Sequence, residues 1–209
     1  MSGAAARRGI PSVQEAVANY AAGAFPMDDR PGAREIPWYV ADERAVLMLD
    51  HDARAALRRR VRRSLRACAD LEWRVDADFA GVVARCAEER EPGDGVWITP
   101  RMQTLYARLH EAGVAHSFEL WTREGEHAAG ILGVLLGRAA LLESMRALRP
   151  HAGNALLSRT VDELAARGVR LCDIQLPTPH TLGLGARLIA KDDYEARLAA
   201  ALDEDVPGA

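Results

Sequence analysis

The chain has 209 residues, of which 49% are hydrophobic, so it can form one ordinary globular domain with a core of its own. A formal net charge of −3 excludes an overall positive field, so a nucleic-acid partner would need a local basic cluster. The three cysteines are scattered without a CxxC pair, which predicts reduced thiols and a cytoplasmic location. No apolar run reaches the roughly 20 residues that span a bilayer, so no membrane partner is expected.

The first predicted element is a helix that begins after Pro11. Ser12 can cap it, Glu15 completes a capping box, and Gly23 is expected to end it. A loop rich in proline and aromatic residues follows, and Arg44–Leu49 is typical of a strand. We take residues 1–44 as a small N-terminal subdomain and residues 45–209 as the main domain.

His51–Ala69 is the most basic stretch and is predicted to form one helix. Leu57, Val61 and Leu65 recur every four residues and supply a narrow buried stripe, so arginines occupy most of the remaining circumference. Like charges one turn apart repel, which makes phosphate the obvious ligand. The arginines concerned are Arg54, Arg58, Arg59, Arg62, Arg63 and Arg66. The alternative is a solvated face whose counter-charges come from other elements. The candidates for those charges are Glu88, Glu89 and Glu91.

The rest of the chain predicts a three-stranded meander placed among helices. The expected helices are Asp78–Glu89, Arg101–Ala112 (capped by Thr99), Asn154–Ala166 and Asp192–Leu202. The expected strands are Ala115–Arg123, Ala128–Leu136, Arg138–Met145 and Val169–Leu176. Short turns join the first three strands, so these should pair antiparallel. The element order resembles the α+β fold of the acetyl-CoA N-acetyltransferase (GNAT) type, a mixed sheet flanked by helices.

Two polar residues stand out in the predicted strand Val169–Leu176. Side chains alternate along a strand, so Asp173 and Gln175 would project from one face. A buried carboxylate and amide are costly to desolvate unless they pair with each other or with a ligand. Alternatively, Asp173 caps a turn or binds a neighbouring backbone amide. Glu143, near the end of the third meander strand, is expected beside them.

Several motifs, in unchanged order across roughly Val13–Leu198, resemble the leucyl/phenylalanyl-tRNA–protein transferase family. They are YAAGAFPM (Tyr20–Met27), WIT (Trp97–Thr99), YxRLHExGxAHSxExW (Tyr106–Trp121), ESM (Glu143–Met145), DxQ (Asp173–Gln175) and HTxGLGA (His180–Ala186). The resemblance implies transfer of leucine or phenylalanine from aminoacyl-tRNA to the N-terminal arginine or lysine of a protein, which marks that protein for degradation. It implies no covalent enzyme intermediate, no metal and no cofactor.

The resemblance also implies roles for individual residues. Asp173 and Gln175 match the proton-accepting and orienting pair, and Glu143 matches a carboxylate that attracts the cationic acceptor. The aminoacyl pocket is implied to be lined by Ile131, Met145 and Leu157. Met27 and Trp97 match positions that flank the terminal adenosine, and the basic helix fits the acceptor stem through its phosphates. Read without the resemblance, Met145, Leu157 and Trp97 are also typical of plain core.

The chain departs from the family pattern in two places. The Pro- and Gly-rich N-terminal segment that usually ends in GGDL is absent, and Arg146-Ala147 and His151–Asn154 replace the usual residues after ESM. We therefore expect retained catalysis with an altered choice of aminoacyl group or amine. Alternatives are tRNA-dependent transfer to a small-molecule amine in a biosynthetic pathway, a non-catalytic tRNA-binding module, and an acetyl-CoA N-acetyltransferase. The last is disfavoured because a phosphate-binding glycine loop is lacking.

Overall fold

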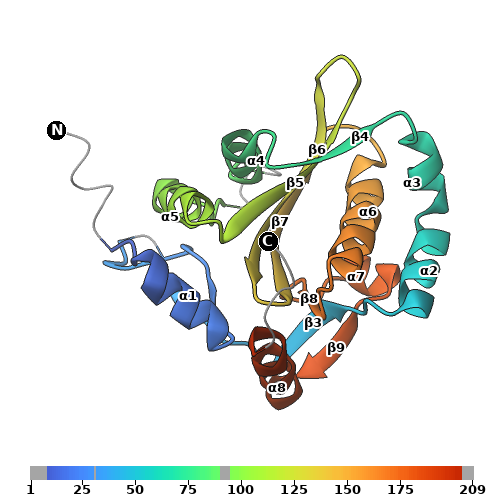
Figure 1. The fold of residues 1–209 in the computed structure, drawn as a ribbon. Coiled ribbons are helices and arrows are strands. Elements are labelled where there is room, and N and C mark those ends of the chain that lie inside the picture. Colours follow the sequence, from blue (N-terminus) through green and yellow to red (C-terminus); the bar gives the residue numbers. More distant parts are fainter. Residues whose placement is uncertain (1–8, 31, 90–94, 204–209) are drawn as a thin grey trace.

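The structure is a computed structural model that describes residues 9–30, 32–89 and 95–203. Within these ranges the chain forms a mixed α+β fold around a seven-stranded sheet in the order β4-β5-β6-β7-β8-β3-β9 (Figure 1). The strands are β4 (Glu72–Val75), β5 (Ala115–Trp121), β6 (His127–Leu136), β7 (Ala139–Ala147), β8 (Leu171–Asp173), β3 (Glu43–Leu47) and β9 (Arg187–Ala190). The predicted meander β5-β6-β7 is confirmed as antiparallel, and β7 and β8 pair in parallel.

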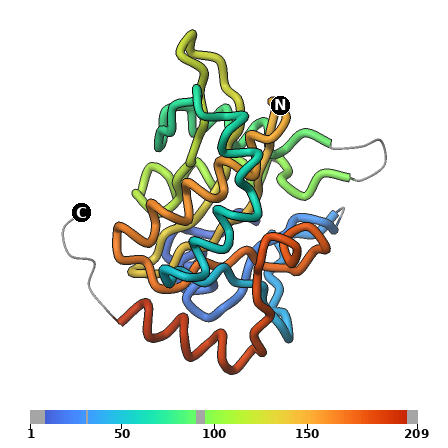
Figure 2. Tube along the Cα trace, turned by 90° about the vertical axis from the view of Figure 1, so that its right-hand side faces the viewer, coloured from blue at the N-terminus to red at the C-terminus, as the bar shows by residue number. Residues whose placement is uncertain are grey.

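Helices cover both faces of this sheet (Figure 1). One face carries α2 (His51–Arg60), α3 (Arg62–Ala67) and α6 (Ala152–Ala166), and Figure 2 shows α6 running beside the other two. The other face carries α1 (Val13–Ala21), α4 (Phe79–Cys86) and α5 (Pro100–Glu111). The last helix, α8 (Lys191–Leu202), packs on β3 and β8. None of the helices in the described ranges combines the length and apolar composition needed to cross a membrane.

Short sequence signals determine where these helices begin, because each capping residue lies within three residues of the start of its helix. Ser12 and Glu15 form the predicted capping box of α1, and Gly23 follows that helix with φ 81°. Asp78 accepts a hydrogen bond at the start of α4, and Thr99 does so at the start of α5.

The basic segment forms two helices, so the prediction of one continuous helix is wrong. Val61 separates α2 from α3 with φ −96° and ψ 14°, while its N–H still bonds the carbonyl of Leu57. β-branched residues have a slightly lowered helix propensity, and the backbone of Val61 leaves the helical region although hydrogen bonds of helical spacing continue across the junction. Leu57 and Val61 are buried and Leu65 is half-buried, so the predicted core stripe is confirmed.

The strand predicted over Val169–Leu176 is shorter, since β8 spans Leu171–Asp173. Ala45 bonds both the N–H of Ile174 and the carbonyl of Gln175, so two residues oppose one, as in a β-bulge. Gln175 takes the left-handed conformation with φ 63°. Asp173 and Gln175 therefore do not project from one regular strand face, which corrects the sequence prediction. The carboxylate of Asp173 bonds the N–H of Gln175 and turns the backbone out of the ladder.

Several short elements have no counterpart in the prediction. They are β4 and β9 at the two edges of the main sheet, α7 (Pro179–Leu184), and the two-stranded sheet of β1 (Phe25–Pro26) and β2 (Trp38–Tyr39). The predicted boundary between residues 44 and 45 falls inside β3, which pairs with β8 and β9. The division into two domains stays a prediction.

Candidate active site

Glu143 lies at an irregularity in the middle of the sheet. On β7, Ser144 pairs with Leu132 and Leu142 pairs with Gly133, so Glu143 is an extra residue in a β-bulge. A bulge redirects side chains locally and is common next to active sites. Here it allows Glu143 to face α5 while Met145, two residues later, packs into the core beneath α6.

Three polar side chains from distant elements surround this carboxylate. Oε2 of Glu143 accepts hydrogen bonds from Nε2 of Gln175 at 2.5 Å and from the Tyr106 hydroxyl at 3.2 Å. Oε1 is buried without a hydrogen-bond partner among the described residues. The buried Tyr20 hydroxyl nearby likewise has no partner in that part of the chain. Burial chiefly raises the pKa of Tyr20, and the carboxylate of Glu143 raises it further, so the two groups are close neighbours.

Burial dominates the electrostatics of Glu143, whose side chain is 7% exposed. Desolvation, opposed by the hydrogen bond from Gln175, raises the pKa of Glu143 from 4.5 to about 7. Its neighbour Tyr106 has a pKa raised well above 10, chiefly by burial, so its hydroxyl is a donor at neutral pH. A carboxyl group poised near neutrality can accept and release a proton under working conditions.

Asp173 is completely enclosed, with 0% exposure, and all of its acceptor positions are engaged. Oδ1 accepts from the backbone N–H of Gln175 at 2.7 Å and from Nε of Arg44 at 3.4 Å. Oδ2 accepts from Nη2 of Arg44 and from the Tyr194 hydroxyl, the latter at 2.8 Å. The alternative in which Asp173 binds a neighbouring backbone amide is thus realised. Its contact with Gln175 is through the main chain, whereas the side chain of Gln175 binds Glu143.

The residues matched to the aminoacyl pocket come together in one core cluster. Ile131 on β6 pairs in register with Met145 on β7, and Leu157 on α6 packs into the same cluster. Ile131 and Leu157 are buried, and Met145 is half-buried. The cluster lies on the α6 side of the sheet, whereas Glu143 contacts Tyr106 on the α5 side.

Met27 and Trp97 are far apart in the sequence, but the segments that carry them are joined. Asp28, next to Met27, pairs with Arg101 at 2.5 Å and accepts a hydrogen bond from the Thr99 hydroxyl. Thr99 lies two residues after Trp97, so this network fixes the two half-buried side chains on neighbouring segments.

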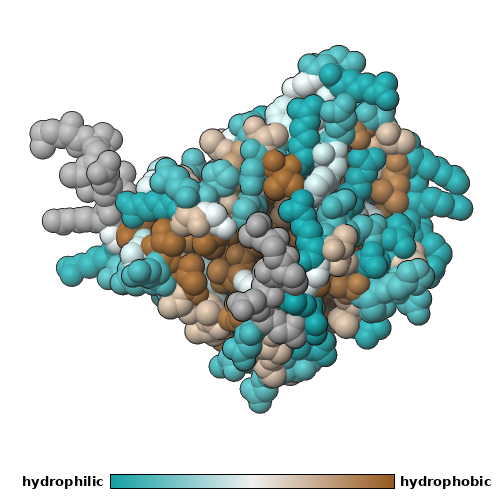
Figure 3. Space-filling model, viewed as in Figure 1, coloured by the Kyte–Doolittle hydropathy of each residue, from teal (hydrophilic) through white to brown (hydrophobic). Residues whose placement is uncertain are grey.

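The arginines of α2 and α3 fall into two groups. Arg54 and Arg58 are paired with Asp162 on α6, at 3.0 and 2.5 Å, so their counter-charge comes from another element. The exposed arginines of these two helices that meet no carboxylate within ion-pair distance in the described ranges are Arg59, Arg60, Arg62, Arg63 and Arg66. Of the acids proposed to neutralise this segment, Glu88 instead pairs with Arg146, and Glu91 lies outside the described residues. This edge is largely hydrophilic at the right of Figure 3.

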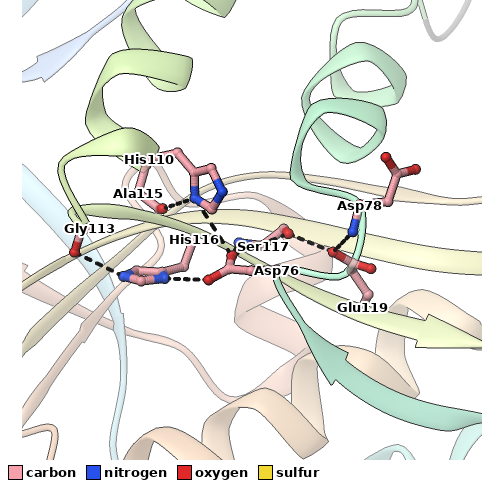
Figure 4. A network of polar contacts seen from close by, with 8 residues as sticks. All are labelled: Asp76, Asp78, His110, Gly113, Ala115, His116, Ser117 and Glu119. Atoms are coloured by element: carbon pink, nitrogen blue, oxygen red, sulfur yellow. Dashed lines mark hydrogen bonds and ion pairs between the residues drawn. The ribbon is translucent and has the colours of Figure 1, made fainter. Parts of the chain in front are cut away.

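A second polar network joins β5 to the turn between β4 and α4 (Figure 4). Asp76 accepts hydrogen bonds from His116 at 2.8 Å and from the N–H of Ser117 at 2.7 Å. The buried Glu119 accepts from Ser117 at 2.6 Å and from the N–H of Asp78 at 3.0 Å. These bonds satisfy both carboxylates locally, so we assign the network a structural role in fastening the turn to β5.

Four further residues of the site were not predicted as functional: Arg44, Tyr194, Tyr20 and Tyr106. Both tyrosines near Glu143 fall on the apolar helix faces expected from the sequence, where burial conceals their hydroxyl groups. The sequence did offer a signal for Arg44, which begins the apolar run RAVLML. A charged residue in a buried strand requires a partner of opposite charge, so a buried carboxylate near it could have been expected.

Comparison with known proteins shows which family the chain belongs to. Residues 47–199 match the sequence model of the leucyl/phenylalanyl-tRNA protein transferase family. The chain is 45% identical over 191 residues to the leucyl/phenylalanyl-tRNA–protein transferase of Anaeromyxobacter sp. (strain Fw109-5), covering 88% of this chain and 76% of that one. It is 42% identical over 189 residues to that of Cereibacter sphaeroides (strain ATCC 17029), covering 88% and 82%. The chain belongs to the leucyl/phenylalanyl-tRNA protein transferase family.

Similarity to solved structures is low. The C-terminal domain of a protein from Agrobacterium fabrum, described as a possible lysylphosphatidylglycerol synthetase, aligns with a TM-score of 0.47 at 13% identity. The alignment covers 90% of this chain and 68% of that one. A likeness of this size does not assign the sheet to a finer fold type.

Proposed function

We propose that the protein transfers an aminoacyl group, leucyl or phenylalanyl by family, from aminoacyl-tRNA to the α-amine of a protein N-terminus. The family resemblance makes an N-terminal arginine or lysine the default acceptor. One observation carries the proposal: in a member of this family, the buried carboxylate Glu143 binds the amide of Gln175 through Oε2, while Oε1 has no hydrogen-bond partner among the described residues.

In the reaction, the neutral α-amine attacks the ester carbonyl carbon that joins the amino acid to the terminal ribose of the tRNA. A C–N bond forms, the ester C–O bond breaks, and the ribose oxygen leaves. The amine must lose a proton as it attacks, and the leaving oxygen must gain one. Glu143 can carry that proton from the amine to the leaving oxygen, so no net proton exchange with another group is needed.

The geometry favours Glu143 over Asp173 for accepting the proton. Asp173 is enclosed and its oxygens are occupied, whereas Oε1 of Glu143 is free of partners among the described residues. Gln175 holds Oε2 and fixes the direction of Oε1, which aligns the amine for attack. The same carboxylate attracts the cationic acceptor. We therefore propose Glu143 and Gln175 as catalytic residues, with Asp173 acting through Gln175.

The donor would be bound along three surfaces, each proposed from the resemblance and supported by placement. Ile131, Met145 and Leu157 form one apolar cluster for the aminoacyl side chain. Met27 and Trp97 stand on segments joined by Asp28 and would flank the terminal adenosine. The phosphates of the acceptor stem would meet the exposed arginines of α2 and α3.

Two broader proposals accompany this function. The parallel pairing of β7 and β8 next to an antiparallel meander supports a GNAT-like sheet. A cytoplasmic location is proposed because aminoacyl-tRNA is a cytoplasmic donor. We also propose that residues 1–44 form a small subdomain of the catalytic unit.

A transfer assay tests the function directly. The intact protein is incubated with radiolabelled Leu-tRNA or Phe-tRNA and a peptide that begins with arginine, and labelled peptide is counted. We expect labelling of this peptide and none of a matched peptide with an acetylated N-terminus. Absence of transfer from every aminoacyl-tRNA tested would overturn the proposed function.

A further inference from the structure

Arg44 is among the most deeply buried side chains of the protein, at 1% exposure. Its guanidinium lies between two aromatic rings, with Cζ at 4.7 Å from the ring centre of Phe25 and 4.6 Å from that of Tyr194. Nη1 donates to the carbonyl of Gly23 at 3.2 Å. The remaining donors, Nε and Nη2, both point to Asp173. A buried charge is costly unless fully paired, and this one is clamped in a single orientation.

The fixed guanidinium of Arg44 determines how the carboxylate of Asp173 is oriented. A carboxylate offers about four acceptor positions, and four donors fill them: two from Arg44, the Tyr194 hydroxyl and the N–H of Gln175. Burial lowers the pKa of Arg44, but the carboxylate of Asp173 raises it above its ordinary value, so the guanidinium stays charged. Asp173 is therefore held in one orientation, in which Oδ1 also faces the main-chain N–H of Gln175.

That main chain is unusual, because Gln175 has φ 63° although it is not glycine. Such conformations are strained in residues other than glycine and persist where neighbours enforce them. Two main-chain bonds hold Gln175 in place: its N–H donates to Asp173 at 2.7 Å, and its carbonyl accepts from the N–H of Ala45 at 2.8 Å. The resulting turn carries the side-chain amide to Oε2 of Glu143 at 2.5 Å.

We infer that Arg44 is a positioning residue of the transfer reaction, which fixes Asp173 and thereby holds Gln175 in the left-handed conformation that aims its amide at Glu143. The inference rests on the proposed function. In this inference Arg44 orients Asp173, Asp173 holds the main chain of Gln175, and the Gln175 amide binds Glu143. The Tyr194 hydroxyl also helps to orient Asp173.

A double-mutant cycle separates this role from a merely structural one. If Arg44 acts through Gln175, then Arg44→Met should lower kcat by about 10- to 100-fold in the wild-type background, with little change in KM for the donor. In a Gln175→Ala background the same substitution should lower kcat by less than about 2-fold, because the amide it positions is gone. Arg44→Lys, which keeps the charge but loses the fork, should restore part of kcat.

Two further variants keep the test decisive. Tyr194→Phe removes one hydroxyl and should lower kcat several-fold, again only when Gln175 is present, so it carries the test if Arg44→Met does not fold. Arg85→Met, on α4, removes the ion pair with Asp78, the N-cap of that helix, and serves as the control for a lost ion pair. It should leave kcat unchanged after correction for the folded fraction.

Additive effects of the Arg44 or Tyr194 variants and Gln175→Ala on kcat would overturn the inference. It would also be overturned if the loss of activity were explained entirely by a smaller fraction of folded protein. These variants are compared with a wild-type protein that has been shown to transfer leucine or phenylalanine. Additive effects would therefore overturn the inference about Arg44 and leave the proposed function intact. A wild-type protein without transfer activity overturns the proposed function, and this inference with it.

Discussion

Gln175 donates its side-chain amide to Oε2 of Glu143 at 2.5 Å, although the two residues are 32 positions apart and lie on different elements. The bond occupies one carboxylate oxygen and leaves Oε1 unpartnered among the described residues. An anchored carboxylate with one free oxygen is suited to receive a proton from a fixed direction. Substitutions at Glu143 and Gln175 should therefore change the rate of the chemical step, whereas substitutions at the proposed tRNA-binding surface should change the affinity for tRNA.

The rate of transfer should depend on the protonation of Glu143. The pKa of this group is raised to about 7, so kcat/KM should increase with pH through about 7 as the carboxyl group ionises. Glu143→Gln should lower kcat by roughly 10²- to 10⁴-fold and abolish that inflection. The measurement is the pH profile with aminoacyl-tRNA and an Arg-initiated peptide. Glu119→Gln, at another buried carboxylate, is the control and should keep the inflection.

Glu143 should also make folding stability depend on pH. Its pKa is about 7 in the folded state against 4.5 for an ordinary glutamate, so only the folded state keeps the proton between these values. The contribution of Glu143 is therefore most favourable below about pH 4.5 and is lost as pH rises through about 7, by roughly 3 kcal/mol in total. Urea unfolding of wild type and Glu143→Gln at pH 5 and pH 8 measures the difference. Parallel pH dependences would contradict the assignment.

The exposed arginines should govern tRNA affinity without affecting the chemistry. Reversal of Arg59 and Arg63 to glutamate should weaken binding of every tRNA similarly, and each lost phosphate contact should reduce the salt slope by about one unit. Turnover of a minimal aminoacyl-adenosine donor should stay near wild type, because it has no stem to hold. Equal loss with both donors would place the helix in the catalytic cleft.

Two comparisons sharpen the tRNA experiment. Arg54 and Arg58 already pair with Asp162, so their reversal should change the salt slope less than reversal of Arg59 and Arg63. Arg197→Glu, on the exposed face of α8, is the control for a charge reversal away from α2 and α3, matched to the single Arg59 or Arg63 reversal, and it should leave the slope unchanged.

Leu157 should control the choice of aminoacyl group. Leu157→Ala deletes a buried side chain, so it should cost about 2–4 kcal/mol of stability and enlarge the proposed pocket. The ratio of kcat/KM for Phe-tRNA to that for Leu-tRNA should then rise several-fold. Leu156→Ala, at the preceding position of α6 in the same core, should cost similar stability without changing the ratio. A ratio equal in both variants would exclude Leu157 from the pocket.

The network in Figure 4 should contribute stability mainly in mildly acidic solution. The hydrogen bond to Asp76 raises the pKa of His116 above 6.5 in the folded state. The contribution of the charged histidine is therefore complete below about pH 6.5 and is lost as pH rises through the higher folded value. His116→Gln should lose about 1 kcal/mol more stability at pH 5.5 than at pH 8.5, measured by urea unfolding. A loss independent of pH would contradict this.

The sequence by itself determined the elements whose signals are local. The capping box of Ser12 and Glu15, the caps Asp78 and Thr99, and the turns of the meander are confirmed because each depends on residues within a few positions. The order of the motifs sufficed to indicate the family. The sequence also indicated that Glu143 and Gln175 are neighbours, because the strand of one was expected beside the strand of the other.

Only the tertiary structure decided how these residues are connected. Arg44 and Asp173 are 129 positions apart and become partners because β3 pairs with β8, a register that no local pattern specifies. The extra residue in β7 turns Glu143 to one face and Met145 to the other, and strand alternation alone cannot reveal such a shift. The left-handed turn of Gln175 likewise depends on the N–H bond to an enclosed carboxylate, which exists only once the sheet has assembled.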